Sequence, residues 1–287
     1  MQLTASAPQG LTGQLRIWLN GRLYNDPHQA TVAGIDHGLV VGDGVFETLK
    51  VTERGAFAVR RHLARLSRSA AALSLPAPDH GQIREAIDAV LDGRDFPRGK
   101  LRVTFTGGGG PLGSEPAYGP PTLIIMLASV DVAPQLTSVV TAPWTRNEHG
   151  ALAGVKSTSY AENVRGLGYA ANNNATEAIF LNTAGHICEG TGTNIFMIFG
   201  DKVITPPLSS GPLAGITREL ILEWSAVEQR DLTLDEARLA DEVFITSSMR
   251  DVQGVERWDD QTFSRANTVT RAVAAAFAER SEADLDP

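Results

Sequence analysis

Short apolar strands and amphipathic helices on both sides of residues 129–135 constrain the fold of this 287-residue chain most strongly. The apolar run TLIIMLA (122–128) has the length of a strand, and a second series of short strands begins with SVVTA (138–142). Mixed strands and helices in both parts predict an α/β or α+β fold with two domains. We expect the domains to cover residues 1–128 and 136–287, with 129–135 as the linker and a ligand site in the cleft between them.

Hydrophobic periodicity predicts the individual elements. LRIWL (15–19) alternates along its length and is followed by Asn20-Gly21, a pair typical of β-hairpins. A glycine- and proline-rich loop, residues 107–121, is too long for a simple turn and is either a functional lid or wall, or a disordered excursion. Further strands are expected at 44–51, 101–106 and 122–128, and helices at 61–75, 80–92, 216–228, 233–240 and 267–280.

Composition argues against several classes of function. A net charge of −8 argues against a nucleic-acid or anionic-membrane partner, because both require clustered lysine and arginine. The single cysteine, Cys188, excludes a disulfide framework within the chain, and the six histidines have no ligand-like spacing, so we expect no metal. The first thirteen residues lack the features of a signal peptide, and the longest apolar run is too short to cross a bilayer. A cytoplasmic protein is expected.

Two charged residues are candidates for chemistry. Lys156 follows an apolar, glycine-rich stretch, and a lysine desolvated in such a setting has a lowered pKa that suits imine formation or proton transfer. Glu189 lies among the apolar and glycine-threonine residues of CEGTGTNIF (188–196), where a buried carboxylate requires a partner. The ordinary alternatives are a surface lysine and a polar turn between strands.

Three stretches have features of ligand sites, and the first two of them suit a phosphate. Residues 190–194 combine glycines with hydroxyls, and the helix expected after Gly215 would present free backbone amides at its start. Ser247 and Ser248 end an apolar strand and are followed by Arg250. Each stretch alone is equally compatible with an ordinary turn or a capped helix.

Six blocks in a fixed order resemble the class IV, fold-type IV pyridoxal-phosphate enzymes, a family that includes D-amino-acid aminotransferases, branched-chain aminotransferases and aminodeoxychorismate lyases. The resemblance extends from about residue 15 to residue 255. The blocks are DHGLVVGDGVFETLK (36–50), RHLARLSRSA (61–70), VKSTSY (155–160), CEGTGTNIF (188–196), LAGITREL (213–220) and VFITSS (243–248).

The resemblance implies roles for individual residues. Lys156 matches the lysine that forms a Schiff base with pyridoxal 5'-phosphate and then moves a proton, and Glu189 matches the acid that pairs with the pyridine nitrogen. It also implies a homodimer and a larger C-terminal domain that binds the cofactor in the interdomain cleft. The further cofactor contacts that it implies are Arg65, Thr193, Asn194, Leu213, Ile216, Thr217, Ser247 and Ser248.

The substrate side departs from the family pattern. Phe46 and Glu47 match the substrate-side strand. D-amino-acid aminotransferases carry an arginine and a histidine in the loop after the strand that corresponds to 101–106, but GGGGPLGS has neither. We therefore expect Arg146 or Arg250 to bind the substrate carboxylate.

The resemblance favours an aminotransferase of the D-amino-acid type, acting on an amino acid and a 2-oxo acid. Aminodeoxychorismate lyase, which releases pyruvate and p-aminobenzoate, is the alternative, and a branched-chain aminotransferase is the second. A non-enzymatic relative would be expected to lack Lys156 or Glu189, and both are present. These residues do not indicate a preference for D- or L-amino acids.

Overall fold

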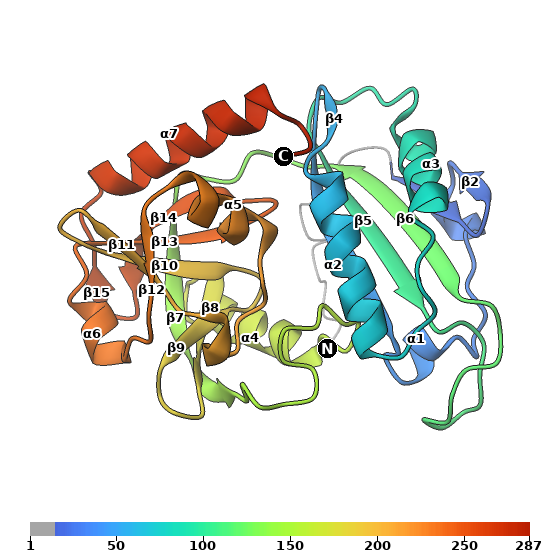
Figure 1. Ribbon diagram of the computed structural model, residues 1–287, viewed down its shortest axis with the longest axis horizontal. Coiled ribbons are helices and arrows are strands. Elements are labelled where there is room, and N and C mark those ends of the chain that lie inside the picture. The colour runs from blue at the N-terminus through green and yellow to red at the C-terminus, as the bar shows by residue number, and fades with distance from the viewer. Residues whose placement is uncertain (1–14) are drawn as a thin grey trace, which may run out of the picture. The chain divides into compact units, whose positions relative to one another are not determined.

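Two units of mixed α/β structure make up the chain in the computed structural model, which describes residues 15–287 (Figure 1). One unit ends at Val132, and the other covers Ala133–Pro287. The expectation that no signal peptide is present concerns residues outside the described range. Among residues 15–287, none of the helices has the length and apolar character needed to span a membrane.

The first unit is built on a six-stranded antiparallel sheet in the order β2-β1-β6-β5-β3-β4. Helix α2 packs on β3, and α3 packs on β6 and β1. Leu63, Leu66 and Ala70 form part of the buried face of α2, as their spacing predicts. The elements are β1 (Arg16–Leu19), β2 (Arg22–Tyr24), η1 (Pro27–Gln29), α1 (His37–Val40), β3 (Gly44–Thr52), β4 (Gly55–Ala56), α2 (Val59–Ala72), α3 (His80–Leu91), β5 (Gly99–Thr106) and β6 (Thr122–Ser129).

The predicted hairpin at Asn20-Gly21 is confirmed. Both residues have positive φ angles, 45° and 94°, which the tight turn between β1 and β2 requires.

His37 forms hydrogen bonds with the base of the glycine- and proline-rich loop between β5 and β6. The His37 amide donates to the Gly108 carbonyl at 2.8 Å, and the His37 ring Nε2 lies 2.9 Å from the Pro111 carbonyl oxygen. Gly108 has φ +77°, and a Cβ there would lie 1.9 Å from the Pro120 carbonyl oxygen. These contacts favour an ordered wall over a disordered excursion for the base of this loop.

The second unit contains a nine-stranded mixed sheet in the order β12-β11-β10-β13-β14-β7-β8-β9, with β15 paired to β14. Helix α4 packs on β7 and β8, whereas α7 packs on β13 and β14 and contacts α5. The elements are β7 (Leu136–Arg146), α4 (Ala161–Asn172), β8 (Glu177–Asn182), β9 (Ile187–Gly190), β10 (Asn194–Phe199), β11 (Lys202–Thr205), η2 (Leu208–Ser210), α5 (Ile216–Trp224), β12 (Val227–Gln229), α6 (Leu234–Arg238), β13 (Glu242–Ser247), β14 (Asp251–Trp258), β15 (Gln261–Thr262) and α7 (Thr268–Ala283).

Two sequence-based expectations differ from this structure. The helix expected at 216–228 ends at Trp224, because Ser225 is extended and Val227 pairs in parallel with Val203 of β11. Helix α4 was not expected, since its buried positions include the polar Asn163 while the apolar Val164 is 65% exposed. The sheets and the remaining helices confirm the expected mixed α/β class.

Replacing Asp36 tests the anchor of the 107–121 loop. The Asp36 carboxylate is 2% exposed and accepts hydrogen bonds from the Thr106 hydroxyl at 3.1 Å, the Thr122 hydroxyl at 2.6 Å and the Gly38 amide at 2.9 Å. Asp36→Ala leaves these donors without their acceptor, so we expect the free energy of unfolding to fall by about 2–3 kcal/mol. Urea denaturation measures this, with the exposed Asp131→Ala as the control. An equal, small effect of both variants would contradict the prediction.

Candidate active site

Lys156 lies on the connection between β7 and α4, where it is half-buried. Its Nζ atom is 5.8 Å from the centroid of the Tyr160 ring. The Tyr160 hydroxyl donates a hydrogen bond to the Thr191 carbonyl at 3.2 Å, and burial raises the pKa of this phenol. The Lys156 amine therefore lies near a neutral phenol that is itself fixed to the turn at 190–193.

Glu189 is a buried carboxylate in β9, with only 8% of the residue exposed. Its Oε2 atom accepts a hydrogen bond from the Leu213 amide at 2.9 Å, and its Oε1 atom lies 3.3 Å from Arg146 Nη1. Burial raises the pKa of Glu189, although Arg146 and the Leu213 amide oppose the shift. The positive charge of Lys156 opposes the shift as well.

Arg146, at the end of β7, is fixed on several sides. In addition to Glu189, its guanidinium donates to Asn163 Oδ1 at 2.6 Å and lies 4.5 Å from the centroid of the Phe180 ring. Asn163 belongs to α4 and is buried. The structure thus brings Arg146, predicted as a substrate ligand, to the Glu189 carboxylate.

The turn at 190–193 is compact because glycine allows close approach. The Gly190 amide donates to the Thr193 carbonyl at 2.8 Å, and a Cβ on Gly190 would lie 2.1 Å from Thr193 Oγ1. The buried Glu177 carboxylate accepts a hydrogen bond from the Thr191 amide at 2.9 Å and another from the Thr191 hydroxyl. Among the residues that the structure describes, the buried Thr193 hydroxyl has no hydrogen-bond partner.

The start of helix α5 adjoins the same turn. Asn194 donates from Nδ2 to the Leu213 carbonyl at 2.9 Å, and a Cβ on Gly215 would lie 1.9 Å from Asn194 Oδ1. Gly215 is the N-cap of α5 and supplies no side-chain cap, so no side chain of the cap residue covers the amides of Ile216 and Thr217. Such a helix start binds anions.

The predicted residues at the end of β13 form a turn with Arg250. The Ser247 hydroxyl accepts a hydrogen bond from the Arg250 amide at 3.2 Å, and Ser248 follows it, partly buried. The Arg250 guanidinium donates to the Thr176 carbonyl at 3.2 Å and to Gln253. These contacts hold Arg250 beside Thr176.

Three predicted residues lie in the first unit. Glu47 is fully buried and accepts from Arg65 Nε at 2.8 Å and from Arg65 Nη2 at 2.6 Å, with His62 Nδ1 also 2.6 Å away. Burial alone would raise the pKa of Glu47, but Arg65 and His62 lower it to about 2. Phe46 lies under the Arg102 guanidinium, 3.8 Å from the ring centroid.

Several residues of these sites were not predicted from the sequence. Tyr160, four positions after Lys156, carried a readable signal as the last residue of VKSTSY. No sequence pattern marked Asn163, Glu177 or Arg102, because their partners are set by packing between segments distant in the sequence.

The donor set of residues 146–217 fits a ligand that carries a phosphate and a basic ring nitrogen. The unpartnered Thr193 hydroxyl and the start of α5 suit a phosphate, and the buried Glu189 carboxylate suits a protonated nitrogen. Lys156 supplies an amine for covalent attachment. These are the features expected of a site for pyridoxal phosphate.

The comparisons with known proteins agree on one family. The family model for amino-transferase class IV matches residues 44–258. A putative branched-chain-amino-acid aminotransferase of Methanocaldococcus jannaschii is 30% identical over 279 residues, which cover 92% of this chain and 95% of that protein. A D-alanine aminotransferase of Staphylococcus epidermidis is 27% identical over 91% of this chain and 96% of its own length. An aminodeoxychorismate lyase of Bacillus subtilis is 29% identical over 82% of this chain and 84% of its own length.

Solved structures agree with this result. The branched-chain aminotransferase of Escherichia coli has a TM-score of 0.86 at 25% identity and covers 92% of this chain and 93% of its own. A hypothetical aminotransferase from Mycobacterium tuberculosis, solved in a PLP-bound form, has a TM-score of 0.81 at 26% identity over 92% of this chain and 97% of its own. The expected fold type is confirmed, and the expected cofactor is confirmed at the level of the family. The chain belongs to the class IV aminotransferases.

Proposed function

We propose that this protein is a pyridoxal-phosphate-dependent aminotransferase that moves an amino group between an amino acid and a 2-oxo acid. One observation carries the proposal: the buried Glu189 carboxylate accepts a hydrogen bond from the amide of Leu213, three residues before the first residue of α5, and Lys156 is one of the charges that act to lower its pKa. A ring-nitrogen acceptor, an attachment point and all the proposed phosphate ligands except Arg65 belong to residues 133–287. The family's known cofactor chemistry supports the same reading.

The roles of the side chains follow from their contacts. When bound, the cofactor supplies an electron-poor ring that accepts the electron pair left as the amino acid loses its α-proton. Lys156 would hold the cofactor covalently through Nζ until the amine of the amino acid takes its place, and the Nζ amine released in that exchange would carry the α-proton. Glu189 accepts a hydrogen bond from the ring nitrogen and keeps it protonated, while Arg146 and the Leu213 amide hold this carboxylate in place.

The proposed phosphate ligands are the residues that the sequence resemblance implies. The start of α5 contributes backbone amides, and Thr193 contributes a buried hydroxyl. Arg65 donates to Glu47 through Nε and Nη2, and the proposal assigns its guanidinium to the phosphate as well. The full proposed set is Arg65, Thr193, Ile216, Thr217, Ser247 and Ser248, with Asn194 and Leu213 beside the ring.

D-amino acids are the first proposed donors, in line with the sequence blocks. Branched-chain amino acids are the second candidate, because the 30% identical relative is named for them and the 107–121 loop lacks the arginine and histidine of the D-amino-acid enzymes. Aminodeoxychorismate lyase is the third candidate, supported by the B. subtilis relative. Arg146 and Arg250 remain the proposed ligands of the substrate carboxylate, and Phe46 and Glu47 the proposed substrate-side residues.

The proposal includes a homodimer in the cytoplasm. The dimer rests on the family resemblance, and the cytoplasm on the single buried cysteine, which gives no disulfide framework within the chain.

Glu189→Gln tests the ring-nitrogen partner. The amide oxygen of glutamine still accepts from the Leu213 amide, but a neutral side chain no longer favours a protonated ring nitrogen. We expect cofactor binding to be retained and kcat to fall by about 100-fold or more. Steady-state kinetics and cofactor titration measure the two quantities, with the exposed Glu228→Gln as the control. Normal turnover by Glu189→Gln would rule out the assigned role.

A substrate comparison tests the reaction itself. Purified protein is assayed with D-alanine and 2-oxoglutarate, with a branched-chain amino acid and 2-oxoglutarate, and with aminodeoxychorismate. We expect oxo-acid formation from an amino acid, with the highest kcat/KM for the D-amino acid. Activity with aminodeoxychorismate alone would contradict the proposed transaminase function and support the lyase.

A further inference from the structure

Residues 147–155, which connect Arg146 to Lys156, form backbone hydrogen bonds mainly with one another. The Gly150 amide donates to the Asn147 carbonyl at 3.0 Å, and the Val155 amide donates to the Leu152 carbonyl at 3.0 Å. Residues 151–154 are exposed. Within the fully described second unit, the hydrogen bonds from this connection to another segment are those that Glu148 accepts.

Both carboxylate oxygens of Glu148 accept hydrogen bonds from Thr183, and Oε1 also lies 3.9 Å from Nε2 of the adjacent His149. Oε1 accepts from the Thr183 hydroxyl and Oε2 from the Thr183 amide, each at 2.9 Å. Only 5% of the Glu148 side chain is exposed. The Thr183 amide is the main cause that lowers the pKa of Glu148 to about 2, so the side chain is a carboxylate throughout the neutral pH range.

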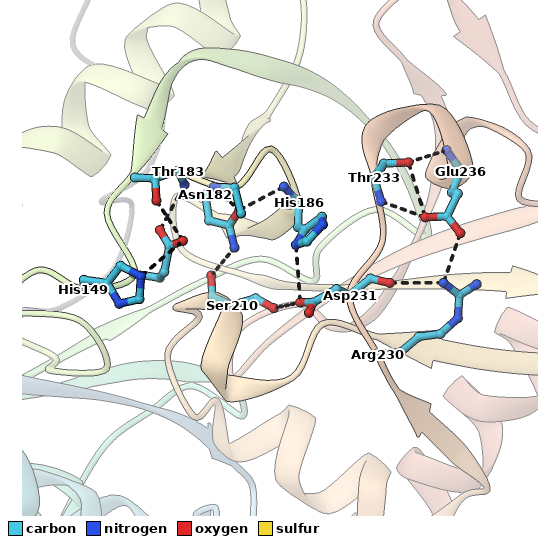
Figure 2. Close-up of polar contacts among 11 residues, drawn as sticks. His149, Asn182, Thr183, His186, Ser210, Arg230, Asp231, Thr233 and Glu236 are labelled. Carbon is cyan, nitrogen blue, oxygen red and sulfur yellow. Dashed lines mark hydrogen bonds and ion pairs between the residues drawn. The ribbon is translucent and has the colours of Figure 1, made fainter.

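Thr183 belongs to a turn that is itself tightly held, as Figure 2 shows for its neighbours Asn182 and His186. Asn182 Oδ1 accepts from the Ala184 amide at 3.1 Å and from the His186 amide at 2.9 Å, and Asn182 Nδ2 donates to the Ser210 carbonyl at 3.3 Å. The turn leads directly into β9, which carries Glu189. Glu148 is therefore attached to the turn that directly precedes the strand of the proposed ring-nitrogen partner.

A third segment, which contains Gly211, packs closely against Glu148. Gly211 has φ +96°, and a Cβ there would lie 2.8 Å from Glu148 Cβ and 3.0 Å from Glu148 Cα. Gly211 lies two residues before Leu213, whose amide binds Glu189. The connection to Lys156, the turn before Glu189 and the segment before α5 thus meet at Glu148.

We infer that Glu148 is a positioning residue for Lys156: its bond to Thr183 fixes the 147–155 connection, and thereby the lysine, relative to Glu189. The inference rests on the proposed function and extends it to a residue outside the proposed cofactor and substrate contacts. Small displacements of a reacting group lower rate steeply, so loss of this bond acts on the reaction rather than on substrate binding.

The chain offers a matched control for Glu148. Glu236 accepts from the Thr233 amide at 3.0 Å and from the Thr233 hydroxyl at 3.3 Å, and these two residues lie together in Figure 2. This second carboxylate–threonine pair caps α6 and has no place in the proposed site. Glu148→Gln and Glu236→Gln therefore make the same change, since each removes the charge and one of the two acceptor oxygens, and Thr183→Val removes the hydroxyl donor from the other partner.

Three quantities are measured for wild type and each variant loaded with pyridoxal phosphate: hydrogen exchange of the 147–156 peptide, the pH midpoint of the cofactor's visible absorption band, and kcat and KM for the amino acid. For Glu148→Gln and Thr183→Val we expect faster exchange in 147–156, a midpoint shifted by about half a unit or more, and kcat lowered about tenfold with KM within about twofold. For Glu236→Gln we expect faster exchange only around 233–238.

An unchanged midpoint and an unchanged kcat in Glu148→Gln and Thr183→Val would overturn the inference, even if exchange increased, because Glu148 would then have only a structural role. Unchanged exchange in 147–156 would overturn it as well. Failure of the proposed function is separate: the wild-type protein itself would then show no cofactor absorption or turnover, while the exchange measurement would still decide whether Glu148 fixes the connection.

Discussion

A buried carboxylate has to be compensated, and at Glu189 this requirement brings together segments of the second unit that are distant in the sequence. Arg146 from the end of β7 and the Leu213 amide from the segment before α5 both reach this side chain. Burial still raises its pKa, so the two partners do not fully compensate the charge. A protonated ring nitrogen would supply the remaining stabilisation, which gives the carboxylate a physical reason to bind the proposed cofactor.

Close backbone approach is the second constraint, and it follows from glycine at particular points. Gly190 brings the Thr193 hydroxyl into the turn, and Gly215 allows Asn194 to lie against the start of α5. Gly166 on α4 allows the helix to pack on Thr191 and Phe180, since a Cβ there would lie 2.6 Å from Thr191 Cγ2. Any larger residue at these points would force apart segments that share the site.

Much of the fold and part of the site could be predicted from sequence. Periodicity gave α2 and α3, and the order of the six blocks indicated the family. Helix α4 was missed because apolar Val164 and Leu167 face outward, whereas Asn163 and Gly166 are buried. Pattern-based reasoning assumes that apolar residues mark the buried face, and this helix does not follow that rule.

Contacts between residues that are distant in the sequence could not be predicted. The Arg65–Glu47 ion pair joins residues that the sequence suggested for two different ligands, and only the packing of α2 on β3 brings them together. Arg146 and Glu189 are 43 positions apart and meet because β7 and β9 flank β8. Spacing cannot reveal such contacts, since they depend on the strand order.

The attachment of the cofactor to Lys156 is the central claim, and one measurement tests it directly. Protein incubated with pyridoxal phosphate is reduced with borohydride, which makes the link between cofactor and lysine permanent, and is then digested and analysed by mass spectrometry. The account predicts the pyridoxyl group on the peptide that contains Lys156, and none after Lys156→Ala. A pyridoxyl group on a different lysine, or on no peptide of the wild-type protein, would contradict it.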